Sequence, residues 1–329
     1  MCIPSDSRKL TMTTAAEAPT VRVWAVVLNP SKFDDPATVK DRVAQLCDAR
    51  GWPTPAWYET TVDDPGFGQA KQAITDGAEL VCPLGGDGTV RAVASGALGS
   101  GVPLGLLPGG TGNLLARNLG LPVDDLDASV EVALTGRTAS IDVGEVRWDG
   151  GEADIFLVMA GMGLDAQIMA GVDEGLKKKV GWWAYVASAV TAVFRLGFAV
   201  RVRADESREF SQHARTVLIG NCGELTGGLQ LIPQAEVDDG VLDVVIASPR
   251  SLASWVAIAI NLITRQRRGH RLFVHRQATR ITVRTREPVE AQLDGDAVGP
   301  KRVLSARILP NALPVRLARR INETPDRSQ

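Results

Sequence analysis

Residues 84–89 have the sequence Leu-Gly-Gly-Asp-Gly-Thr and join an apolar run, Leu80–Leu84, to a segment of helical spacing, Val90–Leu98. Glycines let backbone N–H groups approach phosphate oxygens closely, and the helix N-terminus adds partial positive charge. A bare carboxylate beside a triphosphate is repelled, so Asp87 implies an intervening cation or a proton-accepting role. The alternative interpretation is a tight turn with a solvated aspartate.

A second glycine loop, Pro108–Asn113, also follows an apolar run, Pro103–Leu107, and precedes a short helical segment, Leu114–Leu119. Loops that follow neighbouring parallel strands meet at the carboxyl edge of the sheet, where open α/β folds bind ligands. The sequence contains no G-x-x-x-x-G-K-[ST], so the site is not a Walker-type phosphate site. No G-x-G-x-x-G opens the first strand–helix unit either, which argues against a dinucleotide oxidoreductase.

The N-terminal half alternates strand-like and helix-like segments. Before the first glycine loop these are the strands Val21–Leu28 and Ala56–Thr60 and the helices Asp34–Arg50 and Phe67–Asp76. This alternation predicts a doubly wound parallel sheet with helices on both faces, an α/β nucleotide-binding domain over residues 21–139.

Strand-like runs dominate from the predicted boundary, Thr138–Ile141, onward: Ile141–Trp148, Ile155–Ala160, Ala199–Arg203, Thr216–Asn221, Leu242–Ser248, Arg280–Arg284 and Val289–Leu293. They predict a β-rich, sandwich-like domain of antiparallel sheets over residues 140–320. Two helical segments, Trp182–Gly197 and Leu252–Thr264, interrupt them. The last run, Val303–Leu309, could belong to this domain or return to the first, and the sequence does not decide between the two. Residues 1–20 and 321–329 are expected to be a disordered leader and tail.

Composition narrows the function classes. The formal net charge of −2 gives no basic field for nucleic acid, so no nucleic-acid partner is expected. The four cysteines lie far apart, as is typical of reduced cytoplasmic thiols. The longest uncharged apolar stretch, Val180–Phe194, falls short of the ~20 residues of a transmembrane helix, and residues 1–20 lack the apolar core of a signal peptide. We therefore expect a cytoplasmic protein without a transmembrane segment.

Together, Asn29-Pro30, the Gly-Gly-Asp-Gly-Thr run and the Gly-Thr-Gly-Asn segment resemble, in order and spacing, the diacylglycerol kinase catalytic family. That family includes bacterial lipid kinases and sphingosine and ceramide kinases, and it is distantly related to NAD kinases. The resemblance covers nearly the whole chain and implies an active site in the cleft between the two domains. It also implies ATP and Mg²⁺ as cofactors. The residues expected to bind ATP are Asn29, Pro30, Ser31, Lys32, Thr60, Gly85, Gly86, Asp87, Gly88, Thr89, Gly110, Thr111 and Asn113.

The chain departs from the family pattern at several positions. Ser31-Lys32-Phe33 stands where a small residue and glycine are usual, and Leu114 stands where the family has aspartate. Arg91 occupies a position where asparagine is common. These differences bear on fine contacts and on the substrate class, and they leave the core loops intact.

Two acidic segments of the second half complete the candidate site. The turn Asp294-Gly295-Asp296 resembles the family's Asp-Gly-Glu, whose glutamate is taken as the acceptor of the substrate hydroxyl proton. Asp296 has that position but is one methylene shorter, a loss of about 1.5 Å in reach. Asp142 aligns with an aspartate that lines the cleft. The Asp-Asp-Gly turn at 238–240 resembles the family's structural Mg²⁺ site, which implies the ligands Glu236, Asp239 and the carbonyl of Val241. Both turns also fit ordinary solvated turns.

A lipid acceptor would be reached from a membrane surface. Lys177–Lys179 precede Trp182-Trp183, and three arginines follow the apolar segment Leu252–Thr264. Basic residues beside apolar helices suit peripheral association with the inner face of an anionic membrane. The alternative is that both helices simply cover the second domain's sheets.

Two other functions stay open at this point: a kinase of a soluble hydroxyl acceptor such as NAD, and a catalytically inactive regulator that binds nucleotide or lipid. The sequence also leaves the lipid, the nucleotide preference and the oligomeric state open, a homodimer included.

Overall fold

The computed structural model describes residues 21–163, 197–225, 229–230, 235–248 and 273–319. The predicted helices at 182–197 and 252–264 and the basic segments beside them lie outside these residues, except for Gly197. Within the described part of the chain, no helix is long and apolar enough to cross a membrane.

The N-terminal domain is a parallel sheet with the strand order β2-β1-β3-β4. Its elements are β1 (Trp24–Leu28), the 3₁₀ turn η1 (Pro30–Lys32), α1 (Pro36–Arg50), β2 (Ala56–Glu59), α2 (Phe67–Thr75), β3 (Leu80–Gly85), α3 (Asp87–Ala97), β4 (Leu107–Pro108), α4 (Leu114–Asn118) and α5 (Leu126–Thr135).

Helices cover both faces of this sheet because successive side chains of each strand point to opposite sides. Trp24, Val26 and Leu28 pack with residues of α1 and α5, whereas Ala25 and Val27 pack with residues of α2 and α3. The doubly wound prediction is therefore confirmed. α5 was not predicted. The fourth strand is shorter than the predicted run Pro103–Leu107, because β4 contains only Leu107–Pro108 and Leu104 forms isolated bridges.

The second domain is an antiparallel sheet whose main path runs β14-β13-β10-β7-β15-β16-β5-β6, with β8 paired to β15 and to β9. Its strands are β5 (Arg137–Trp148), β6 (Ala153–Phe156), β7 (Met159–Gly163), β8 (Phe198–Ala204), β9 (Phe210–Ala214), β10 (Thr216–Gly220), β11 (Glu224–Leu225), β12 (Leu229–Gln230), β13 (Leu242–Ala247), β14 (Phe273–Ala278), β15 (Arg280–Leu293) and β16 (Asp296–Leu317). The predicted β-rich class is confirmed.

Three strand predictions change in detail. The run 155–160 is divided into β6 and β7, because the N–H groups of residues 157–159 bind the Asp294 carboxylate instead of continuing one strand. The runs 280–284 and 289–293 form one strand, β15, with a register shift between them. β9, β14 and the strands of a separate two-stranded sheet, β11 and β12, were not predicted.

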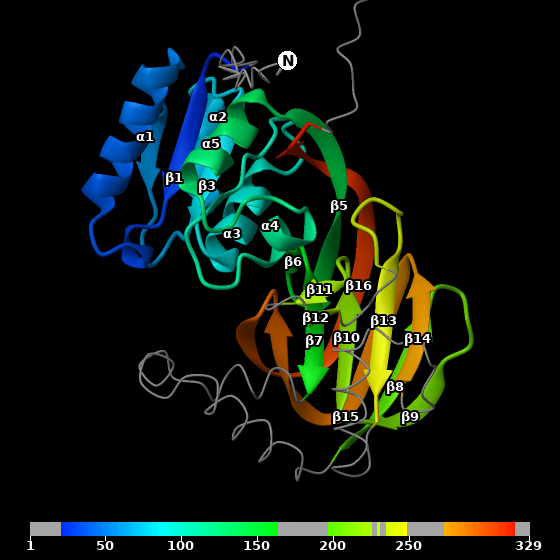
Figure 1. The fold of residues 1–329 in the computed structure, drawn as a ribbon. Helices are drawn as coiled ribbons and strands as arrows, with labels where there is room; N and C mark the ends of the chain where they lie inside the picture. The colour runs from blue at the N-terminus through cyan, green and yellow to red at the C-terminus, as the bar shows by residue number, and fades with distance from the viewer. Residues whose placement is uncertain (1–20, 164–196, 226–228, 231–234, 249–272, 320–329) are drawn as a thin grey trace, which may run out of the picture.

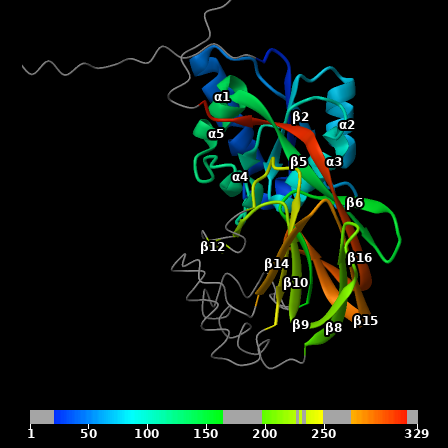
Figure 2. The same cartoon turned by 90° about the vertical axis from the view of Figure 1, so that its right-hand side faces the viewer.

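Two long strands connect the domains. β5 and β16 run side by side through the predicted boundary, as both views show (Figures 1 and 2). The far end of β16 returns to the first domain, where Leu104 forms a parallel bridge with Val315. There Arg316 donates hydrogen bonds to the carbonyls of Ala133 and Leu134 at the end of α5.

The interface between the domains is apolar and continuous with the core. One buried cluster contains Val93 and Leu115 of the first domain together with Leu157 and Leu218 of the second. Burying apolar surface on both sides stabilises one arrangement of the domains. The carboxyl edge of the parallel sheet is consequently held against the start of β7 and the turn between β15 and β16.

Candidate active site

The two glycine loops lie against each other at the carboxyl edge of the sheet. A β-carbon at Gly110 would come within 2.6 Å of the Gly86 α-carbon, and one at Gly112 would collide with the Asp87 carboxylate. Any side chain at these two positions would push the loops apart. The N-cap of α3 is Gly86, which has no side chain to accept from the first turn. The first N–H groups of α3 are thereby left to bind an anion.

Asn29 fixes the third segment of this edge. Its side-chain oxygen caps η1 by accepting from the N–H and hydroxyl of Ser31, and its amide donates to the Thr89 hydroxyl over 3.1 Å. Lys32 follows, with its Cε 3.8 Å from the position a β-carbon would take at Gly86. The segment after β1 thus reaches the glycine loop after β3.

The other residues predicted to contact ATP come from the same edge. Thr60 follows β2, is buried, and donates its N–H to the Leu28 carbonyl. Asn113 has a left-handed backbone with φ of 49°, and its side chain bonds both the N–H and the carbonyl of Gly110. Thr111 lies between Gly110 and Asn113 in the second glycine loop and is exposed. The segments that contain these positions follow neighbouring strands at one edge of the sheet, and their role in binding ATP remains a prediction.

Asp87 links the two loops. Its Oδ1 accepts the N–H of Leu114 over 2.6 Å, so the carboxylate faces the second glycine loop. Burial raises the pKa of Asp87 to about 6, and the charges of Asp294 and Asp296 add to that effect. A small pocket beneath it is lined by Val90, Leu106, Leu107, Pro108, Asn113, Leu115 and Ala116. The Asp87 carboxylate thus joins the first glycine loop to the start of α4.

The turn between β15 and β16 brings Asp296 to the same place. A β-carbon at Gly88 would lie 3.2 Å from Asp296 Oδ2. Arg91 donates to that oxygen over 2.9 Å, and the Asp296 side chain remains 57% exposed. The residue predicted to accept the substrate proton therefore lies beside the first glycine loop and stays open to solvent.

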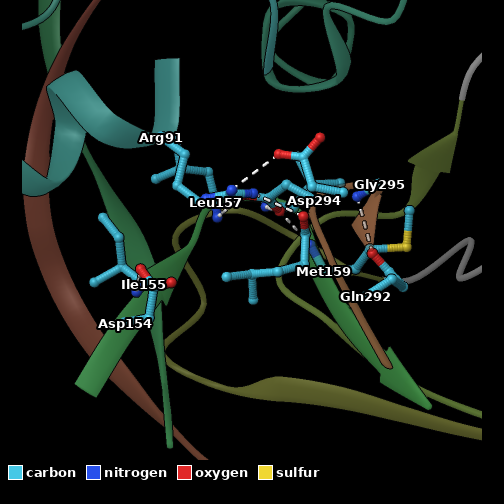
Figure 3. A network of polar contacts seen from close by, with 11 residues as sticks. Arg91, Asp154, Ile155, Leu157, Met159, Gln292, Asp294 and Gly295 are labelled. Atoms are coloured by element: carbon cyan, nitrogen blue, oxygen red, sulfur yellow. Dashed lines mark hydrogen bonds and ion pairs between the residues drawn. The ribbon is translucent and has the colours of Figure 1, made fainter. Parts of the chain in front are cut away.

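Asp294 is a structural residue of this site, and no separate role was predicted for it from the sequence. Its carboxylate is buried and accepts the N–H groups of Leu157, Val158 and Met159 over 2.9–3.0 Å (Figure 3). Burial raises the pKa of this carboxyl, whereas the charge of Arg91 and the three N–H groups oppose that change. Asp294 fixes the turn to the start of β7. The Asp-Gly pair was the recognisable signal in the sequence, because it tolerates the left-handed φ of 48° that Asp294 adopts.

The resemblance implied that Asp142 lines the cleft, but this residue has no exposed surface in the structure. It is fully buried in β5, and its two oxygens accept the N–H groups of Gly240 and Asn311 over 2.7 and 2.6 Å. Its own N–H donates to the Val237 carbonyl. These contacts fix the position of the Asp-Asp-Gly turn.

The Asp-Asp-Gly turn presents oxygen ligands of the kind that Mg²⁺ prefers. Burial raises the pKa of Asp239, and the charges of Asp243, Asp142 and Glu236 raise it further. A bound cation would relieve this concentration of negative charge. No three His, Cys, Asp or Glu side chains among the described residues are arranged around one metal position, so a cation held by Glu236 and Asp239 would need the Val241 carbonyl and water to complete its ligand set.

Comparison with known proteins agrees with this geometry. Residues 23–146 match the diacylglycerol kinase catalytic domain, and residues 158–317 match the YegS C-terminal NAD kinase beta sandwich-like domain. A "Probable lipid kinase YegS-like" of Pseudomonas aeruginosa is 32% identical over 75% of this chain and 79% of its own length. The chain belongs to the diacylglycerol kinase catalytic-domain family.

Other members of the family are similar over comparable lengths. The "Diacylglycerol kinase" of Bacillus subtilis is 26% identical over 78% of this chain and 84% of its own. A crystal structure of a diacylglycerol kinase from Bacillus anthracis has a TM-score of 0.67 at 18% identity, covering 91% of this chain and 97% of that one. This likeness shows the shared fold. Family membership identifies the protein as kinase-like, and it implies ATP as the phosphoryl donor.

Proposed function

We propose that the protein is an ATP-dependent lipid kinase, which transfers the γ-phosphate of ATP to the hydroxyl of diacylglycerol or a related lipid. The observation that carries the proposal is the meeting of Asp87 and Asp296 at the glycine loops. One carboxylate faces the phosphate-binding backbone, and the other faces solvent beside it.

Phosphoryl transfer requires positioning and charge neutralisation more than covalent chemistry. The N–H groups at the start of α3 and in the second glycine loop bind the phosphate oxygens. Asp87 would hold the Mg²⁺ that accompanies ATP, and that ion would supply positive charge beside the transferring group. Asp296 accepts the proton of the acceptor hydroxyl as the oxygen attacks phosphorus. The Asp239 turn, with Glu236 and the Val241 carbonyl, would hold a second Mg²⁺ that stabilises the second domain.

The lipid acceptor is supported by the curated relatives, whose names are lipid kinase and diacylglycerol kinase. The basic segments at 177–179 and 265–268 remain our candidates for peripheral membrane contact. If Lys177–Lys179 bind anionic lipid, changing all three to glutamate should abolish binding to anionic liposomes. Unchanged liposome binding would remove this segment from the proposal.

The function is tested by incubating the protein with γ-labelled ATP, Mg²⁺ and a panel of lipids in mixed micelles, beside Asp87→Ala. We expect label in phosphatidic acid or an analogous lipid, and none with the variant. Label that appears only on a soluble acceptor such as NAD would replace the lipid with that acceptor. ATP binding without transfer to any acceptor would favour a regulatory role.

A further inference from the structure

Two positions at which this chain departs from its family pattern, 91 and 296, are separated by 205 residues and are partners in the structure. Arg91 lies one helical turn after Asp87 in α3, so both side chains project from the same face of that helix. The Arg91 guanidinium leaves the first domain and reaches the turn between β15 and β16 (Figure 3).

The guanidinium makes two hydrogen bonds there. Nη1 donates to the Leu293 carbonyl over 2.7 Å, and Nη2 donates to Asp296 Oδ2 over 2.9 Å. The fixed fork of a guanidinium sets both acceptors relative to each other as well as to α3. Only 18% of the Arg91 side chain is exposed, which strengthens these bonds compared with a fully solvated pair.

The other residues of the turn are held by contacts that do not involve the Asp296 side chain. Asp294 fixes the turn's backbone to β7, and Gly295 donates its N–H to Gln292. Arg91 is the side chain that holds the exposed Asp296 carboxylate toward Gly88. It also places a positive charge among Asp87, Asp294 and Asp296, where the negative charge of ATP must be accommodated.

We propose that Arg91 is a positioning residue that joins the domains at the reaction site and compensates for the shorter side chain at position 296. By binding the Leu293 carbonyl and the Asp296 carboxylate together, it holds the proton acceptor at the first glycine loop. The catalytic part of this proposal rests on the proposed function, because Asp296 acts as a base only if the protein phosphorylates a hydroxyl.

Kinetics separate positioning from nucleotide binding. Arg91→Asn should lower kcat about 100-fold, the size of effect typical of a misplaced general base, with KM for ATP changed less than about threefold. Arg91→Lys keeps the charge but lacks the fork, so we expect an intermediate kcat. In the double variant Arg91→Asn with Asp296→Glu, the longer acid no longer needs Arg91, and kcat should recover at least about tenfold over Arg91→Asn alone.

Arg42→Asn is the matched control. Arg42 also binds an aspartate, Asp127, with two hydrogen bonds, but it does so on the far side of the sheet between α1 and α5. This variant should keep the wild-type kcat. Equal kcat for Arg91→Asn and wild type would overturn the proposal. A raised KM for ATP at constant kcat would also overturn it, by making Arg91 a nucleotide ligand, and so would an absence of recovery in the double variant.

Amide hydrogen exchange tests the same contact without any acceptor. In Arg91→Asn, amides of residues 290–299 should exchange at least about tenfold faster, while those of β10 are unchanged. Unchanged exchange at 290–299 would contradict the bridging role even in an inactive protein. If wild type labels no lipid but the exchange differs as expected, the proposed function fails while the structural role of Arg91 stands.

Discussion

The second domain presents two acidic turns that look alike in sequence and are held by opposite arrangements. In Asp294-Gly295-Asp296, the buried carboxylate belongs to the turn itself, and Asp294 fastens it to β7 beside the glycine loops. In Asp238-Asp239-Gly240, the buried carboxylate comes from another strand, because Asp142 of β5 binds Gly240. The turn's own carboxylates are exposed.

This difference suggests a different function for each turn. The first is rigid and is bound to α3 through Arg91, so it can present one carboxylate to a reacting group. The second collects Glu236 and Asp239 with no arginine bound to either in the described structure, which favours a cation as the source of positive charge. The first turn is thus our candidate for chemistry, and the second is our candidate for a structural metal.

The largest expected effect is at the nucleotide edge that the first turn faces. Asp87→Asn keeps an oxygen for the Leu114 N–H but removes the charge, and we expect kcat to fall about 10³-fold or more with no loss of melting temperature. Steady-state kinetics and calorimetry measure both. Asp127→Asn, at a half-buried aspartate of α5 that is bound to Arg42, serves as the control. Activity within tenfold of wild type in Asp87→Asn would remove Asp87 from the mechanism.

Asp294→Asn tests whether the first turn depends on its buried carboxylate. The amide can accept at one oxygen only, and its NH₂ group faces N–H donors, so the free energy of unfolding should fall by about 3 kcal/mol. Because Asp296 loses its support, kcat should fall as well. Chemical denaturation and kinetics on one preparation give both quantities. Full stability in this variant would mean that the three N–H contacts contribute little.

Asp142→Asn and Asp239→Asn test the second turn, Asp238-Asp239-Gly240. We expect Asp142→Asn to cost about 2 kcal/mol, because Gly240 and Asn311 then compete for one oxygen. Asp239→Asn should leave stability in EDTA unchanged and remove the increase that Mg²⁺ gives to wild type. Melting curves of wild type and Asp239→Asn with and without Mg²⁺ measure this difference. An equal Mg²⁺ response in wild type and Asp239→Asn would place the stabilising ion elsewhere.

The last prediction is a pH dependence. The pKa of Asp87 is raised to about 6 in the folded protein, so the folded state binds its proton more tightly than the unfolded state does. Its contribution to stability is full below about pH 4 and is lost as the pH rises through about 6. In EDTA, the stability of wild type minus that of Asp87→Asn should therefore decline between these values and stay level above them. A constant difference would contradict the raised pKa.

The sequence predicted the parallel sheet and the glycine loops well because both depend on local signals, namely buried valine-rich runs and glycines at strand ends. It could not predict what Asp142 and Asp294 bind, since their partners lie 98 to 169 and 135 to 137 residues away. α5 was missed although Asp125 caps its first turn, because its apolar spacing is interrupted by acidic residues. Arg91 was noticed only as a departure, and its i to i+4 relation to Asp87 was the available signal.

We propose that the glycine loops and the Asp294–Asp296 turn form one site that phosphorylates a lipid hydroxyl. The most direct test supplies γ-labelled ATP with diacylglycerol micelles and NAD together, using wild type and Asp296→Asn, and measures ATP binding separately. We predict label in the lipid fraction with wild type, and at least about a 100-fold slower rate with Asp296→Asn at unchanged ATP affinity. If wild type labels NAD instead of the lipid, or if Asp296→Asn labels the lipid as fast as wild type does, the proposed lipid kinase site is wrong.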